Sequence, residues 1–138
     1  MDSGSKAYLT FRVAHKNLAI EACHVRAVLP MEGLTLYPGI GPAVLGLASL
    51  SGQFFPVLDL RAKLDLLQGS GGRDPRIVVI VVRDHLAGFI ADRVASVHTY
   101  HARHLRNGSL FGIGRPKRLL RMESIVNEQD LASFCLIR

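Results

Sequence analysis

The sequence has 138 residues, a length typical of one domain or of two very small subdomains that share a core. Its hydrophobic content of 49% fits a globular protein, and its longest aliphatic run, residues 77–82, is far shorter than the roughly 20 residues of a membrane-spanning helix. We therefore expect no membrane insertion. The first residues, MDSGSK, lack the apolar core of a secretory signal, so the expected compartment is the cytoplasm.

The formal net charge is +6, and the positive charge is concentrated in one segment. Residues 93–122 contain no Asp or Glu. Seven basic residues lie there: Arg93, Arg103, Arg106, Arg115, Lys117, Arg118 and Arg121. A segment of this sign favours an anionic partner such as an acidic protein face, nucleic acid or a membrane surface.

The first elements predict a hairpin and an apolar edge. Residues 8–13 alternate in part and predict a strand, residues 15–17 a polar turn, and residues 18–21 a second strand. The apolar pattern continues through residues 25–29 until Pro30, which lacks a backbone donor and breaks the ladder. Residues 33–42 are rich in Gly and Pro and predict an irregular surface connection.

The stretch from Val44 to Leu64 is the most informative one. Residues 44–50 and 54–58 are two apolar runs around Ser51 and Gly52, which predicts a β-hairpin with a buried face. Residues 60–67 have the composition of a short helix. The Gly- and Ser-rich tract that follows marks a soft boundary near residues 68–76 within a single domain of residues 1–138.

The second half of the chain repeats this order of strand, turn and return strand. Residues 77–82 predict a buried strand, residues 83–85 a turn and residues 86–91 a return strand. In both halves an apolar strand ends in Asp with Arg close behind, as Asp59 and Arg61 and then as Asp92 and Arg93. Two such units fit two similar small barrels better than one sandwich.

The C-terminal third has weaker patterns. Residues 94–100 extend the sheet, residues 101–117 predict a loop, and residues 118–126 predict a last strand. Asn127 is a good N-cap for a terminal helix through about residue 134, because acidic residues follow in its first turn.

Three blocks of the chain match one family in register. Its opening strand, turn, second strand and V-x-x-V edge correspond to residues 8–28. Its G-V-x-N-L-R-G-x-x-x-P-V-x-D-L-R motif corresponds to residues 46–61, and its G-x-x-V-D-x-V-x-x-V block to residues 88–97. The chain therefore resembles the CheW-like family, coupling proteins that link chemoreceptors to a histidine kinase in bacterial chemosensory arrays. The resemblance is good over residues 8–100 and loose in the tail.

The resemblance implies a mainly β fold of two intertwined small five-stranded, SH3-like β-barrels with short helices, including a C-terminal helix. It implies a non-enzymatic adaptor with no cofactor and no metal, which binds the cytoplasmic tip of a methyl-accepting receptor and the regulatory domain of a CheA-type histidine kinase. The receptor-binding positions are Val25, Ala27, Val28 and Ser51. The kinase-binding positions are Leu45, Gly46 and Leu47. Gly46 is the most specific of these predictions, since a glycine permits close backbone approach across an interface.

Two positions depart from the family pattern. Members usually have Glu where this chain has Ala27 and Arg where it has Ser51. Charges of this kind fix register and partner choice, so their loss predicts an altered receptor preference. A degenerate paralogue with a non-standard partner is the first alternative. The second is a basic small-barrel protein that binds single-stranded nucleic acid through Tyr100 and Phe111, although two aromatics make a thin platform.

The residues that could suggest catalysis are better explained by structural roles. Asp59 and Asp92 follow strands and are expected to accept turn amides or ion pairs rather than to act as an acid–base pair. Ser49 and Ser51 are not in a nucleophile elbow. No phosphate-binding motif contains Gly39.

Three further patterns do not predict a ligand site. Gly112 and Gly114 do not begin a nucleotide-binding loop. His98, His101 and His104 have a metal-like spacing on a helix, but the segment predicts a strand, which sends alternate side chains to opposite faces. Cys23 and Cys135 belong to no CxxC motif and to no Cys/His pair at zinc-ligand spacing, so two reduced thiols are expected.

Overall fold

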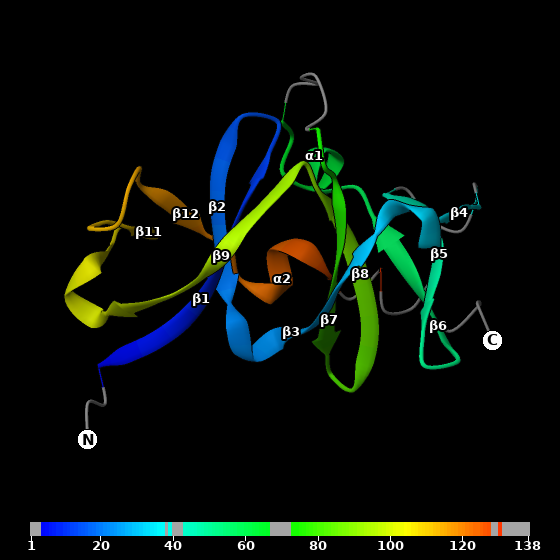
Figure 1. Ribbon diagram of the computed structural model, residues 1–138, viewed down its shortest axis with the longest axis horizontal. Coiled ribbons are helices and arrows are strands. Elements are labelled where there is room, and N and C mark those ends of the chain that lie inside the picture. Colours follow the sequence, from blue (N-terminus) through cyan, green and yellow to red (C-terminus); the bar gives the residue numbers. More distant parts are fainter. Residues whose placement is uncertain (1–3, 38, 40–42, 67–72, 128–129, 131–138) are drawn as a thin grey trace.

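The structure, a computed structural model, describes residues 4–37, 39, 43–66, 73–127 and 130. It is mainly β, with two six-stranded sheets and a few short helices (Figure 1). In Figure 1 the sheet that contains β1, β2 and β9 lies to the left, the sheet that contains β4 to β8 lies to the right, and α2 lies between them. The predicted mainly β class is confirmed.

The first sheet has the strand order β10-β11-β12-β2-β1-β9. Its strands are β1 (Ser5–Val13), β2 (Lys16–Glu21), β9 (Arg93–His101), β10 (Leu105–Arg106), β11 (Ser109–Leu110) and β12 (Lys117–Leu119). The pairing is antiparallel except between β12 and β2, which run parallel. The sheet therefore joins the start of the chain to its C-terminal third.

The second sheet has the order β3-β7-β8-β6-β5-β4. Its strands are β3 (Val25–Pro30), β4 (Thr35–Leu36), β5 (Val44–Leu50), β6 (Gln53–Leu58), β7 (Arg76–Val82) and β8 (His85–Ala91). β6 and β8 pair in parallel, and the other pairs are antiparallel. The expected boundary near residues 68–76 thus lies between strands of one sheet, and residues 67–72 are outside the described part of the chain.

Tight two-residue turns set the register of the hairpins. Both central residues have positive φ in the turns at Ala14 and His15, at Ser51 and Gly52, and at Arg83 and Asp84. Two consecutive positive φ values are typical of type I′ turns, whose twist matches that of antiparallel strands. The predicted turn positions are confirmed to within one residue, although non-glycine residues occupy most of them.

The prediction for residues 101–126 is wrong in two places. Residues 101–117 are not one loop: the 3₁₀ turn η3 (Ala102–His104) leads to the β10–β11 hairpin, whose turn is Asn107 and Gly108. Asn-Gly is a strong hairpin signal that the low hydrophobicity around it concealed. Residues 118–126 are not one strand either, because β12 ends at Leu119 and the helix α2 (Met122–Ile125) follows.

Side chains cap α1 and the turn that begins at Asn127. α1 (Leu60–Lys63) is shorter than predicted and begins at Asp59, whose carboxylate accepts a hydrogen bond from the backbone N–H of Arg61 at 3.0 Å. Asn127 and Asp130 exchange backbone-to-side-chain hydrogen bonds of 2.9 Å each, the pattern of a capping box. This agrees with Asn127 as an N-cap, and residues 131–138 are outside the described part of the chain.

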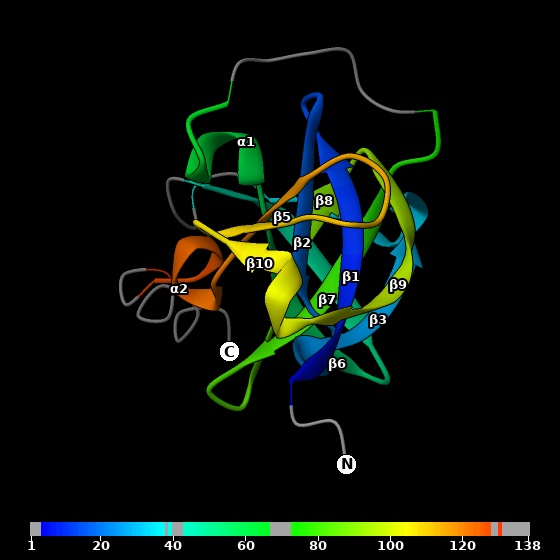
Figure 2. The same ribbon diagram turned by 90° about the vertical axis from the view of Figure 1, so that its left-hand side faces the viewer.

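One hydrophobic core is shared by both sheets. It contains Leu9 and Phe11 from β1, Val78 from β7 and Phe89 from β8, and the rings of Phe11 and Phe89 lie 5.1 Å apart. Leu60 of α1 and Ile125 of α2 pack into the same cluster, and Figure 2 shows both helices on one side of the sheets. The sheets are therefore held together by a common core.

A partly buried ion pair joins α1 to the corner where the chain passes from the second sheet to the first. Asp92, at the corner between β8 and β9, accepts hydrogen bonds from the Arg61 guanidinium at 2.9 and 3.0 Å and from the backbone N–H of Ala14 at 2.8 Å. The side chains of Arg61 and Asp92 are 24% and 12% exposed. The Arg of the first motif therefore pairs with the Asp of the second.

We predict that Asp92→Ala lowers the free energy of unfolding by about 2 to 4 kcal/mol, since it leaves the guanidinium and a buried N–H without their acceptor. Urea denaturation measures the change. The exposed pair of Arg76 and Asp74, 3.1 Å apart, is the control. Asp74→Ala is expected to cost less than about 1 kcal/mol, and equal losses for the two variants would contradict the assignment.

Tyr100 carries an unusual buried hydroxyl. Its side chain packs edge-on against Tyr8 with ring centroids 5.7 Å apart, and within the described chain its hydroxyl has no hydrogen-bond partner. Burial raises the pKa of this phenol. The hydroxyl has thus lost its hydration without a protein partner in return.

Tyr100→Phe is therefore expected to raise the free energy of unfolding by about 1 kcal/mol, because it removes an unsatisfied polar group and keeps the ring. Thermal and urea denaturation test this. A destabilised variant would show that the hydroxyl is hydrogen-bonded in solution.

Candidate functional site

The predicted receptor-binding residues on β3 lie on an edge strand. Among the residues that the structure describes, β3 pairs only with β7, and its side chains alternate between half-buried and exposed along the strand. Val25 and Ala27 are half-buried, and Val28 is 39% exposed. An edge that presents small apolar side chains is suited to contact another apolar surface.

Ser51 lies at the exposed tip of the β5–β6 hairpin, with φ 52°. Its neighbour Leu50 and Ala27 of β3 pack against the same small cluster of buried side chains. The members of this cluster are Ala48, Phe55, Val57, Ile77 and Val79. The hairpin that carries Ser51 and the β3 edge therefore pack on one buried cluster of the second sheet.

The predicted kinase-binding residues lie on β5 and have different surroundings. Leu45 and Leu47 are half-buried, and Gly46 has its backbone against β4. A Cβ atom at Gly46 would lie 2.1 Å from the carbonyl oxygen of Thr35 and 2.9 Å from Cα of Leu36. The close backbone approach expected at this glycine is therefore made by β4 of the same chain, and contact of Gly46 with a kinase stays a prediction.

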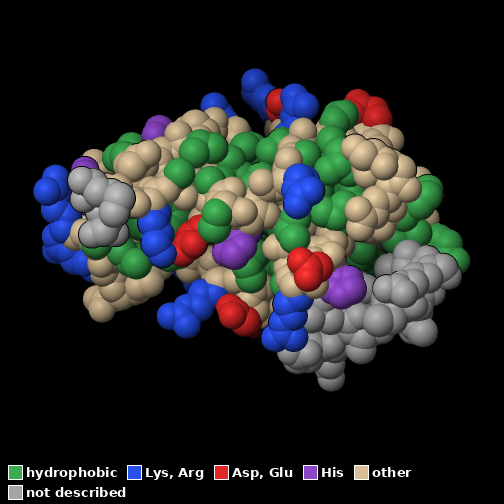
Figure 3. Space-filling view, turned by 90° about the horizontal axis from the view of Figure 1, so that it is seen from below, with side chains coloured by type: hydrophobic (Ala, Val, Ile, Leu, Met, Phe, Trp, Pro, Cys, Tyr) green, Lys and Arg blue, Asp and Glu red, His purple; other side chains and the backbone are tan. Residues whose placement is uncertain are grey.

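Large apolar side chains are exposed around the same strands. Leu36 is 72% exposed, Tyr37 55% and Phe54 69%. Phe54 is paired with Ser49, which shares a face of β5 with Leu47, so Phe54 and Leu47 lie on one face of the sheet. Figure 3 shows hydrophobic side chains exposed at the right-hand end of the molecule, the end that carries β4 to β6. The exposure of Phe54 was not predicted, because residues 54–58 form one apolar run that predicts a strand with a buried face.

The opposite end of the molecule is basic. Figure 3 shows Lys and Arg side chains gathered at the left-hand end, which carries β10 to β12. However, Tyr100 is only 1% exposed. The aromatic platform predicted from Tyr100 and Phe111 is therefore wrong, because burial removes one of its two rings.

The three spaced histidines do not form a group of converging ligands within the described chain. His98 is hydrogen-bonded to Ser96 and His101 to Ser5. His104 lies in η3, where it accepts the backbone N–H of His101, and the two rings are 5.6 Å apart. His98 and His101 are three residues apart on β9, and strand alternation sends their side chains to opposite faces.

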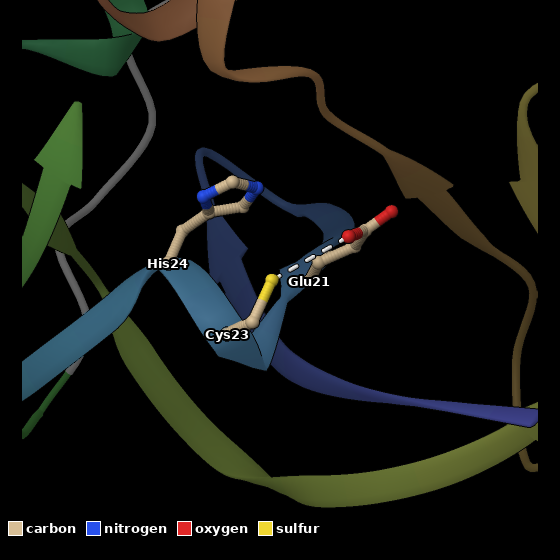
Figure 4. A group of neighbouring side chains, drawn as sticks. All are labelled: Glu21, Cys23 and His24. Carbon is tan, nitrogen blue, oxygen red and sulfur yellow. Dashed lines mark hydrogen bonds between the residues drawn. The ribbon is translucent and has the colours of Figure 1, made fainter. Parts of the chain in front are cut away.

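A different group of metal-ligating side chains is present. Glu21 at the end of β2 and Cys23 and His24 in the 3₁₀ turn η1 (Ala22–His24) place their ligand atoms within 4.8 Å of one another (Figure 4). The Cys23 thiol donates a hydrogen bond to Glu21 Oε2 at 3.6 Å. Partial burial and this hydrogen bond raise the pKa of the thiol. The group of Glu21, Cys23 and His24 was not predicted, because its spacing matches no standard zinc-binding motif.

Comparison with known proteins identifies the fold and the family. The model of the CheW-like domain matches residues 7–133. The chain belongs to the CheW-like domain family. Its structure superposes on the scaffolding protein TtCheW from Thermoanaerobacter tengcongensis with a TM-score of 0.74, 19% identity and coverage of 84% of this chain and 88% of that one. The fold is thus the CheW-like one, with two SH3-like β-barrel subdomains.

Curated relatives carry the same family name. The chain is 33% identical to the chemotaxis protein CheW of Bacillus subtilis (strain 168) over 93 residues, which is 67% of this chain and 60% of that protein. It is 25% identical to the chemotaxis protein CheW of Helicobacter pylori over 134 residues, covering 88% of this chain and 81% of that one. The match to the Bacillus protein therefore spans less than two thirds of its length.

The family match and the shared fold confirm the predicted resemblance and the architecture of two small barrels. Each sheet has six strands where five were predicted. In the described part of the chain, no helix has the length and apolar character required to cross a membrane. The binding assignments for the β3 edge, Ser51 and β5 stay predictions.

Gly46→Ala is expected to lower the free energy of unfolding by about 1 to 3 kcal/mol, because the added methyl group would collide with the β4 backbone. Gly33 is the matched control, since a Cβ there meets nothing within 4 Å. Gly33→Ala is expected to change stability by less than about 1 kcal/mol. Similar urea midpoints for Gly46→Ala and the wild type would contradict the close packing.

Proposed function

We propose that this CheW-like domain is a non-enzymatic scaffolding adaptor of chemosensory signalling, which couples the cytoplasmic tip of a methyl-accepting receptor to the regulatory domain of a CheA-type histidine kinase. The observation that carries the proposal is the family match over residues 7–133. Relatives named chemotaxis protein CheW and the fold shared with a scaffolding protein support it.

The non-enzymatic part of the proposal is supported by how the candidate acids are used. Asp59 caps α1, and Asp92 is occupied by Arg61 and the Ala14 amide. Both carboxylates therefore have structural partners of the kind expected for acids at strand ends. Scaffolding requires surfaces for two partners and no bond chemistry.

The receptor-binding surface in this proposal is the β3 edge with the β5–β6 hairpin. A receptor tip made of amphipathic helices would place apolar side chains against Val25, Ala27 and Val28. Ser51 lies on the hairpin whose Leu50 packs on the same cluster as Ala27. Charged side chains at Ala27 and Ser51, as are usual in the family, would lie at the edge of this apolar contact and could pair with charges on the receptor.

The kinase-binding surface in this proposal is the apolar face formed by Leu47 and Phe54, and β4 lies beside it because Thr35 pairs with Leu47. Exposed aromatic and aliphatic side chains of this kind are typical of the core of a protein interface. Leu45 and Gly46 support the surface from β5, because Leu45 accepts a hydrogen bond from Tyr37 and Gly46 lets β4 approach. The two surfaces meet on the β5–β6 hairpin, because Ser51 lies at its tip while Leu47 and Phe54 lie on its strands.

The kinase assignment predicts a strong effect of the exposed phenylalanine. We expect micromolar affinity for the kinase regulatory domain, about 8 kcal/mol, and a loss of about tenfold or more for Phe54→Ala. Phe54 is 69% exposed, so the variant is expected to fold normally. Calorimetric titration measures the affinity.

Val97→Ala is the matched control for this measurement, because Val97 is 58% exposed on β9 of the other sheet. It should bind the kinase domain as the wild type does. Unchanged affinity of Phe54→Ala would remove this face from the interface. Absence of kinase binding by the wild type would overturn the proposed function.

The receptor assignment predicts a gain of binding. Ala27→Glu together with Ser51→Arg restores the charges usual in the family and is expected to increase affinity for a conventional receptor tip. Each single variant should gain less, because a lone charge in a partly desolvated groove lacks its compensating partner. A double-mutant cycle by calorimetry reports the coupling.

The control places the same charges in matched positions of the other sheet. Ala95 is an exposed strand residue, and Asn107 precedes Gly108 in a turn with φ 50°, as Ser51 precedes Gly52. Ala95→Glu with Asn107→Arg should leave receptor affinity unchanged. A wild type that already binds like ordinary family members, or a double variant that gains nothing, would contradict altered receptor preference at Ala27 and Ser51.

A further inference from the structure

The side chains of Glu21, Cys23 and His24 converge at the corner between β2 and β3 (Figure 4). They offer a carboxylate, a thiol and an imidazole, three groups that ligate zinc in proteins. Cys23 is exposed, and Glu21 and His24 are half-buried. The group is therefore accessible to an ion from solvent.

The local backbone creates this convergence. Glu21 ends β2 in an extended conformation, and the chain then turns through η1, which is closed by a hydrogen bond from the Val25 N–H to the Ala22 carbonyl. The tight turn brings three residues of a four-residue segment together. An uninterrupted strand would have sent adjacent residues to opposite faces.

The measured spacing fits tetrahedral coordination. Zinc–sulfur and zinc–oxygen bonds of about 2.3 and 2.0 Å at a tetrahedral angle place the two ligand atoms about 3.5 Å apart. The distance from Cys23 Sγ to Glu21 Oε2 is 3.6 Å. The remaining ligand-atom distances are within 4.8 Å, so the side chains have to approach by roughly 1 Å to reach tetrahedral spacing.

The second oxygen of Glu21 is already held. Lys6 of β1 forms an ion pair with Oε1 at 3.3 Å, while Oε2 faces the thiol. The carboxylate can thus give one oxygen to a metal and keep the other on Lys6. A ligand oriented by a neighbouring group loses less side-chain freedom on binding.

We propose that Glu21, Cys23 and His24 form a binding site for a zinc-class divalent cation, with a fourth position left to water or to a ligand from a partner. Coordination replaces the thiol proton, which is released to solvent, and forms bonds from the metal to sulfur, nitrogen and oxygen. A thiolate and an imidazole favour such an ion over calcium or magnesium, which prefer oxygen ligands. The site adjoins Val25 at the start of β3.

The test uses the full chain, freed of metal and titrated with Co²⁺, whose bonds to thiolates give a charge-transfer absorption. The wild type should develop this absorption with one equivalent of metal, and Zn²⁺ should abolish it. Cys23→Ser should lose the absorption, whereas Cys135→Ser, which changes the chain's other cysteine, should keep it.

Calorimetry with Zn²⁺ tests the other two ligands. Glu21→Gln and His24→Gln should each weaken zinc binding by about tenfold or more, while Glu32→Gln and His85→Gln should not change it. In the wild type, Zn²⁺ should also protect Cys23 from alkylation, as measured by mass spectrometry of its peptide. This readout requires no variant to fold.

Three results would overturn the proposal: no cobalt absorption in the wild type, absorption that persists in Cys23→Ser, or alkylation of Cys23 at the same rate with and without Zn²⁺. Any of them would show that the three side chains form only a hydrogen-bonded surface group. The outcome is independent of the proposed adaptor function, which is tested by kinase and receptor binding.

Discussion

The carboxylate of Asp92 connects three parts of the chain that are distant in sequence. It binds the Arg61 guanidinium at the start of α1 and the Ala14 amide in the β1–β2 turn, while its own backbone N–H donates to the Arg12 carbonyl. This fixes the first hairpin and α1 against the corner where the chain leaves the second sheet for the first. Because the pair is largely buried, both partners must be present for either to be tolerated.

The two candidate binding surfaces belong to one sheet. The β3 edge and the strands β4 to β6 are joined through β7 and β8, and Ala27 and Leu50 pack on the same buried cluster. An adaptor benefits from such an arrangement, since flexible surfaces would pay an ordering cost at each binding event. The basic end around β10–β12 lies away from the apolar end and gives the molecule charge asymmetry (Figure 3).

Gly46 has a packing role that is distinct from its proposed part in kinase binding. Its missing side chain is required by the backbone of β4, which would otherwise collide with a Cβ at 2.1 Å. Loss of binding in a Gly46 variant can therefore arise from displaced β4 rather than from a lost contact. Phe54, exposed on the neighbouring strand, separates the two effects because its truncation leaves the core intact.

Up to about residue 100 the main strands, the hairpin turns and the family resemblance could be predicted from the sequence, because alternation, turn residues and motif register are local properties of the chain. Beyond that point the β10–β11 hairpin and α2 were not predicted. The sequence located Val25, Ala27, Gly46 and Ser51 by motif position. Only the tertiary structure decided that Arg61 pairs with Asp92, that Tyr100 is buried, and that Glu21 meets Cys23 and His24. Those contacts depend on how the chain crosses between sheets and turns through η1, and spacing along the sequence carries no such information.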